Sequence, residues 1–115
     1  MQPEDLYIVT ITEESIKVQP PSGGPEEVLW KHIYEIRLVN TDTGPFEPDI
    51  WLVLIGENET GCMIPHGNKD FEAVYDIISK YEKFSFDNFI ASMSSTQKEE
   101  FILWKKEWVE PGAAN

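Results

Sequence analysis

Cysteine, histidine and basic side chains are scarce in this 115-residue sequence, and each scarcity argues against a class of protein. The one cysteine, Cys62, excludes an intrachain disulfide, and a single thiol is typical of a reducing compartment. Nine lysines and arginines stand against 21 acidic residues, which gives a formal charge of -12. This balance argues against nucleic-acid binding by a basic surface and against docking on anionic lipid.

Long apolar runs are missing as well. The longest, residues 50–55, is far shorter than the ~20 residues that span a bilayer. The acidic start, residues 1–5, lacks the basic residues and apolar run of a signal peptide, so we expect a cytoplasmic protein that binds no membrane. Hydrophobic residues make up 41% of the chain, enough for one core. We predict a single domain over 1–115, ordered from 5 to 108, with a tail at 109–115.

The first two-thirds of the chain predicts short strands that are separated by turns. Proline and glycine mark loops at 20–25 and 41–48, and Asn58 and Gly61 predict a hairpin turn over 57–61. Residues 49–56 are apolar on both faces, which is typical of a central strand. Over 27–34 a helix is an alternative to a strand. The predicted strands are 6–12, 16–18, 27–30, 34–39, 49–56 and 61–65.

The apolar period changes to that of a helix near residue 70. Five apolar or aromatic residues from Phe71 to Tyr81 share one face, which predicts a helix over 70–81 capped by Asn68 or Asp70. A shorter second helix over 87–93 buries Phe89, Ile90 and Met93. Thr96 and Glu99 form a capping-box pattern. Residues 101–108 fit either a helix or a last strand.

Strands followed by helices predict an α+β fold. We expect one strongly curved antiparallel sheet of six or seven strands, covered by the main helix over 70–81. The predicted core residues are Trp30, Ile33, Ile36, Leu52, Leu54, Ile64, Val74, Ile78 and Phe101.

Three motifs carry a resemblance: Asp-Thr-Gly-Pro-Phe at 42–46, Asp-Ile-Trp-Leu-Val-Leu at 49–54 and Gly-Cys-Met-Ile-Pro at 61–65. Through them the chain resembles a group of small bacterial proteins of unassigned function. The spaced strands, the step from Trp30 to Ile33 and the late helix also resemble a pleckstrin-homology-type domain, which implies a similar barrel or sheet. The resemblance implies no binding residues, because the first strands have fewer lysines and arginines than those of the lipid-binding members.

Few residues could carry chemistry. Cys62 and His66 could form a thiolate nucleophile, but residues four apart in a strand are about 13 Å apart. We therefore predict a structural cysteine and no catalytic residue, no metal site and no cofactor, since no metal-ligand or phosphate-binding motif is present. A small hydrolase or metal-dependent enzyme using Cys62 and His66 is kept as an alternative, and a small-ligand or lipid carrier is another.

The negative charge is uneven along the chain. Residues 1–60 carry 12 acidic and three basic side chains, a balance of -9, whereas residues 61–115 have a balance of -3. Our leading hypothesis is a non-enzymatic acidic protein–protein interaction module. One version is an immunity-type inhibitor that blocks a basic, nuclease-like toxin through long-range attraction. Its expected partner-binding residues are Asp42, Glu47, Asp49 and Trp51. Self-association, and an acidic surface that serves solubility alone, are the alternatives.

Overall fold

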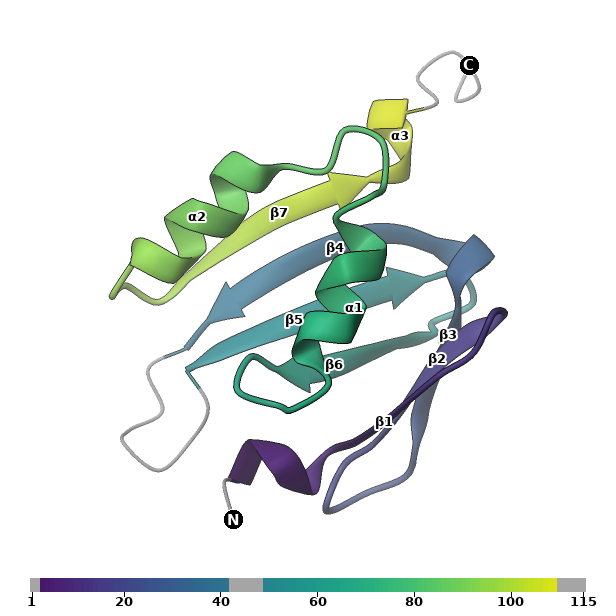
Figure 1. Cartoon of the computed structure of the whole chain (residues 1–115). Coiled ribbons are helices and arrows are strands. Elements are labelled where there is room, and N and C mark those ends of the chain that lie inside the picture. The colour runs from purple at the N-terminus through teal and green to yellow at the C-terminus, as the bar shows by residue number, and fades with distance from the viewer. Residues whose placement is uncertain (1–2, 42–48, 110–115) are drawn as a thin grey trace.

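The computed structural model describes residues 3–41 and 49–109, which form two antiparallel sheets and several short helices (Figure 1). Two elements, η1 and η2, are single 3-10 turns. In chain order the elements are η1 (Pro3–Leu6), β1 (Ile8–Ile11), β2 (Ser15–Gln19), β3 (Glu26–Leu29), η2 (Trp30–His32), β4 (Ile33–Asn40), β5 (Ile50–Gly56), β6 (Gly61–Pro65), α1 (Phe71–Ile78), α2 (Phe86–Ser94), β7 (Glu99–Lys105) and α3 (Lys106–Val109).

The α+β class is confirmed, but the prediction of one curved sheet is wrong. The described strands form a three-stranded sheet, β1-β2-β3, and a four-stranded sheet, β6-β5-β4-β7. The η2 turn ends β3, and β4 then pairs with β5 and β7 instead of extending the first sheet. Where β3 approaches β6, the Met63 backbone N–H donates to the Glu26 carboxylate at 3.0 Å. A side chain thus satisfies a strand-edge donor that another strand would otherwise pair with.

The prediction of one main helix is also wrong. α1 has eight residues and ends before Ser79, because the following N–H groups of Lys80 and Tyr81 bond three residues back and tighten the turn. α2 has nine residues and begins at Phe86, after the N-cap Ser85, whose hydroxyl accepts from the Asn88 N–H. Ile90, predicted to be buried by this helix, is 61% exposed.

The ambiguous segment over 101–108 contains both of the expected structures. β7 takes the chain to Lys105, and α3 follows at once. The capping box of Thr96 and Glu99 is wrong, because Glu99 begins β7 and so does not lie in a helix.

One core joins both sheets and the helices. Seven of the nine predicted core residues are buried, whereas Trp30 and Phe101 are half-buried. The Trp30 indole N–H reaches outward to the Thr12 carbonyl at 2.9 Å, which explains its partial exposure. Asn40 and Ser92 form a buried reciprocal pair that ties β4 to α2: the amide donates to the Ser92 carbonyl at 2.9 Å, and the Ser92 hydroxyl donates to Asn40 Oδ1 at 2.6 Å.

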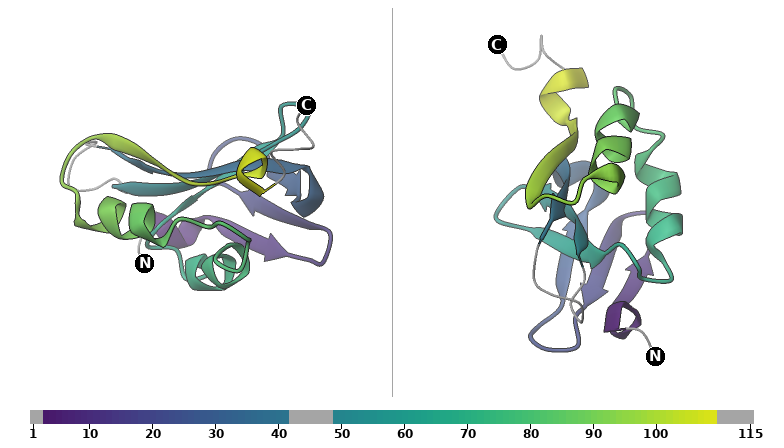
Figure 2. Two further views of the ribbon diagram at one scale, coloured as in Figure 1. Left: turned by 90° about the horizontal axis from the view of Figure 1, so that it is seen from above. Right: turned by 90° about the vertical axis from the view of Figure 1, so that its left-hand side faces the viewer.

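The two longer helices lie on the same side of the four-stranded sheet (Figure 2). Phe71, Val74 and Ile78 of α1 enter the core on that side. Neither α1 nor α2 covers the opposite face. No helix of the described residues has the length and hydrophobicity needed to cross a bilayer.

Candidate functional site

The expected partner-binding residues are placed only in part by the structure. Asp42 and Glu47 lie outside the described residues. Asp49 is exposed directly before β5, where its carbonyl accepts from the Thr41 N–H at 2.7 Å. Trp51 lies in β5, half-buried, with the Tyr7 ring edge-on at 5.5 Å between centroids. The structure therefore places Asp49 and Trp51 close together at the start of one strand.

Trp51 belongs to an apolar surface on the side of the four-stranded sheet that α1 and α2 leave uncovered. Successive side chains of a strand point to opposite faces, and Leu52 and Leu54 of β5 are fully buried on the core side. The cross-strand register gives the residues on the other side. We call this surface the outer face; its apolar members are Val39, Trp51, Val53, Ile55, Met63 and Ile102, all half-buried except Met63, which is 39% exposed.

A row of charged residues crosses the outer face on β4 and β7. Arg37 pairs with the carboxylates of Glu35 and Glu100, the latter at 2.7 Å, and Lys105 lies 4.0 Å from Glu35. The hydrogen bond to Glu100 and the contacts with Glu35 outweigh burial and raise the pKa of Arg37. Its Nε is buried without a hydrogen-bond partner in the described part of the chain. The guanidinium is therefore held in place by two carboxylates beside the apolar members of the face.

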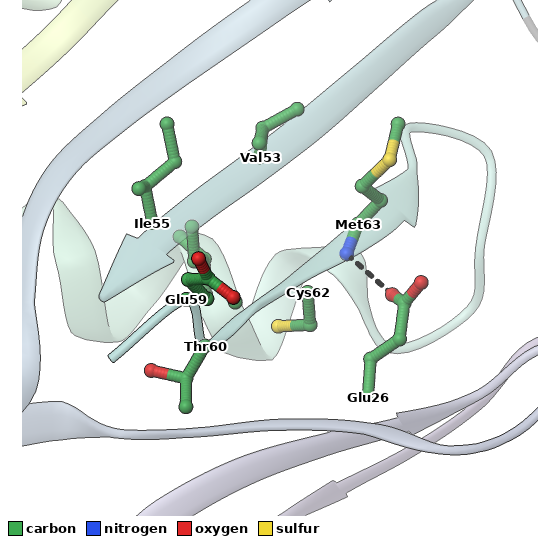
Figure 3. A pocket seen from close by; sticks show the side chains of 9 residues that line it. Glu26, Val53, Ile55, Glu59, Thr60, Cys62 and Met63 are labelled. Atoms are coloured by element: carbon green, nitrogen blue, oxygen red, sulfur yellow. Dashed lines mark hydrogen bonds between the residues drawn. The ribbon is translucent and has the colours of Figure 1, made fainter. Parts of the chain in front are cut away.

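A hollow of about 370 Å³ lies where the outer face meets the hairpin between β5 and β6 (Figure 3). Val53, Ile55 and Met63 line it and point to the same side of the sheet in Figure 3. Glu26 of β3 and Glu59 of the hairpin add two carboxylates to its lining. The arrangement offers apolar contact together with negative charge.

Cys62 lines the same hollow but lacks the properties of a nucleophile. It is 3% exposed, and burial, with a smaller effect from the charge of Glu26, raises the pKa of its thiol to about 12. The thiol therefore stays protonated at neutral pH, and the thiolate is the reactive form. His66 is exposed beyond the end of β6, with its ring edge-on to Phe71 at 4.8 Å. These observations give no support to the enzyme that the sequence left as an alternative.

Metal binding and ligand carriage also lack support. The described residues contain no group of three histidine, cysteine or carboxylate side chains that could hold a metal ion. A hollow of about 450 Å³ is lined by Glu13, Glu14, Leu29, Trp30 and Lys31. Leu29 and Trp30 supply its apolar lining and the other three side chains are charged, so this hollow gives no specific support for a carrier of lipids or similar ligands.

Comparison with known proteins gives no relative: no protein-family model, no curated protein and no solved structure matches the chain. The resemblances to small bacterial proteins and to pleckstrin-homology-type domains therefore stay predictions, and function has to be argued from this chain alone.

The sequence predicted Trp51 but missed the rest of the outer face. Residues 50–55 are apolar without a break, which predicts a strand that is buried on both faces. β5 is indeed an inner strand, between β4 and β6. One feature of the sequence indicates this face: it predicts only two helices, too few to cover both sides of the sheet that contains β5.

Proposed function

We propose that this protein is a non-enzymatic interaction module that binds a basic protein through the outer face of its four-stranded sheet. The observation that carries the proposal is the apolar outer face, which neither α1 nor α2 covers, in a chain with a formal charge of -12. An apolar sheet face that is bordered by charged side chains is characteristic of protein-binding sites.

The composition of the face supports a protein partner. Binding hot spots are enriched in tryptophan and arginine near the centre of an interface. The outer face contains both: Trp51 lies two positions before Val53 in β5, and Arg37 lies two positions before Val39 in β4. Arg37 is held by its two carboxylates before any partner arrives, so ordering this side chain costs little on binding.

The charge of the chain determines what kind of partner fits. Long-range attraction to an acidic protein raises the association rate of a basic one and repels acidic competitors. Asp49 directly precedes β5, and Glu59 and Glu26 line the hollow beside the hairpin that follows it, so carboxylates stand at two ends of the outer face. A basic protein with an apolar centre to its contact surface is the complementary partner.

One version of this function is an immunity-type inhibitor. Small size, strong acidity and an apolar sheet face would let the chain cover the active surface of a basic, nuclease-like toxin in the cytoplasm. Co-expression tests this version: the partner is toxic when expressed alone and harmless with this protein. A partner that is harmless by itself contradicts the inhibitor version.

Site-specific photo-cross-linking in an extract of the organism that encodes the protein, at defined salt concentrations, tests the proposal itself. A cross-linking amino acid at Met63, on the outer face, is compared with one at Glu72, exposed on α1. We expect one basic protein to be captured at Met63 and not at Glu72, with a yield that falls as salt rises from 50 to 500 mM, roughly the range over which screening becomes strong. Equal capture at both positions, capture that ignores salt, or none would contradict the proposal.

A further inference from the structure

The hollow beside Met63 has apolar walls, two carboxylates and no cation. Val53, Ile55 and Met63 form the wall on the outer face, and Glu26 and Glu59 contribute their carboxylates (Figure 3). No lysine, arginine or histidine is among the residues that line it. Within the described residues, neither glutamate takes part in an ion pair.

Glu26 is held in position at this site by the backbone. Its Oε1 accepts from the Met63 N–H at 3.0 Å, on the side of β6 that faces away from β5. Among the described side chains and backbone groups, none donates a hydrogen bond to the second oxygen, Oε2. One oxygen of a fixed carboxylate therefore stays available to a donor from outside.

The hairpin turn fixes the backbone of Glu59, whereas its side chain is exposed. Its backbone has a φ of 61°, next to Asn58 at 60°, and the Thr60 N–H closes the turn by donating to the Glu57 carbonyl at 3.2 Å. A left-handed conformation at a glutamate is unfavourable by roughly 1–2 kcal/mol. Glycine would adopt this conformation more easily, so the turn carries a carboxylate at a position where local backbone energy does not favour one.

We propose that this hollow binds a basic side chain of the protein partner, and arginine above all. The aliphatic stem would lie along Val53 and Met63, and the guanidinium would donate to Glu26 and Glu59. Arginine suits the site because its cation is weakly hydrated and has five N–H donors, enough for two carboxylates. The inference rests on the proposed function, since it names the chemistry that the partner brings to the outer face.

A metal ion is a poorer occupant of the hollow. Hard divalent cations take six or more oxygen ligands, whereas Val53, Ile55 and Met63 offer none. The group of three metal-ligating side chains that such an ion would require is not found in the described part of the chain. The apolar wall would make no favourable contact with a metal ion, whereas it can pack against the aliphatic part of an arginine side chain.

Titration with N-butylguanidinium, followed by the backbone amide signals in a ¹H–¹⁵N spectrum, tests the inference without the partner. We expect saturable shifts at Met63 and Gly61, and none with N-butylurea, which has a similar shape without the charge. N-butylammonium is expected to bind more weakly. Shifts that do not saturate, or that spread over the acidic surface, would overturn the inference.

Three variants make the titration specific. Glu26→Gln keeps an oxygen that can accept from the Met63 N–H, and Glu59 is exposed, so both variants are expected to fold. Glu26→Gln and Glu59→Gln should each weaken binding about threefold or more, as loss of one partly exposed ion pair does. Glu72→Gln removes the same charge from α1 and should leave the affinity unchanged. An equal effect of all three would show general attraction to an acidic protein and overturn the site.

The titration tests the arginine site and the cross-linking tests the proposed function, so a negative result in one does not imply a negative result in the other. A basic protein captured at Met63, with no saturable binding of N-butylguanidinium, would overturn the arginine site and leave the interaction module standing. Saturable binding at Met63 with no captured partner would keep the cation site and contradict the proposed function.

Discussion

At the scale of single residues, Cys62 and Asn40 are both buried, but burial has different consequences for the two side chains. Burial disfavours the charged form of Cys62 and so makes the thiol inert. Burial with hydrogen bonds to Ser92 at both ends of its amide makes Asn40 part of the framework that holds α2 against the sheet. The sequence alone allows two roles for Cys62, a nucleophile or a core side chain, and its buried environment favours the second.

Alkaline pH should destabilise the fold through Cys62. The thiol ionises near its ordinary pKa of 9.0 in the unfolded chain and at about 12 in the folded one. Below pH 9 both states keep the proton; between pH 9 and 12 the unfolded state loses it first. The free energy of unfolding therefore falls as pH rises, by up to about 1.4 kcal/mol per pH unit from this group.

Denaturant unfolding at pH 8, 9, 10 and 11 measures this dependence, with Cys62→Ala as the control. Burial raises the pKa of Tyr81 too, so the variant should keep a shallower decline. Iodoacetamide should leave the folded protein unmodified at pH 8 and label it fully in denaturant. Rapid labelling of the folded protein, or identical pH slopes for the two proteins, would contradict the assignment of Cys62 as a buried, protonated thiol.

Removing the amide of Asn40 should be strongly destabilising. Asn40→Ala leaves the buried Ser92 hydroxyl and carbonyl without these partners, which is expected to cost about 2 kcal/mol or more of unfolding free energy. Ser94→Ala, at an exposed position of the same helix, is the matched control and should change stability by less than about 0.5 kcal/mol. Thermal or urea unfolding compares the two, and equal effects would refute a structural role for the pair.

The hairpin between β5 and β6 is the element in which stability and the proposed function conflict. Asn58 and Glu59 both have positive φ, a conformation that glycine adopts without a side-chain clash. The sequence predicted this hairpin from Asn58 and Gly61, and the turn is confirmed. Gly61 serves a different purpose: a Cβ there would lie 2.6 Å from the Leu54 carbonyl oxygen, so it permits close strand contact.

Glu59→Gly should therefore stabilise the fold while weakening the site. Relief of the left-handed backbone is expected to raise the free energy of unfolding by about 0.5–1 kcal/mol. The same change removes one carboxylate from the hollow and should weaken N-butylguanidinium binding about threefold, as loss of an exposed ion pair does. Urea unfolding and the amide titration measure the two effects separately. A destabilised variant, or one that binds as well as the unchanged protein, contradicts this account of the turn.

Local sequence patterns predicted most strands and helices but not how they assemble. Period-two alternation and the proline and glycine loops place β5, β6 and the hairpin correctly, because these depend on neighbouring residues. The split into two sheets comes at the η2 turn, and the hydrogen bond that links the sheets joins Glu26 to Met63, which are 37 positions apart, so local patterns reveal neither feature. α2 is longer than the predicted helix over 87–93. It starts earlier because Ser85 caps it, and the apolar period does not reveal a capping residue.

At the scale of the whole molecule, the candidate site arises from assembly. Val53 and Met63 are neighbours across β5 and β6, but Glu26 reaches them only because β3 packs against the edge of β6. No motif in the sequence connects these residues. The prediction of a basic partner comes from composition alone, since the excess of 12 negative charges is a property of the whole sequence, and it stays a prediction.

Binding of the cross-linked partner to outer-face variants tests the central claim most directly. Val53→Lys places a positive charge in the centre of the outer face, and Thr10→Lys places the same charge at an exposed position of β1, in the other sheet. Isothermal calorimetry with the purified partner should show at least about a tenfold loss of affinity for Val53→Lys, a difference of about 1.4 kcal/mol, and a much smaller change for Thr10→Lys. Equal affinities for the two variants would contradict binding through the outer face.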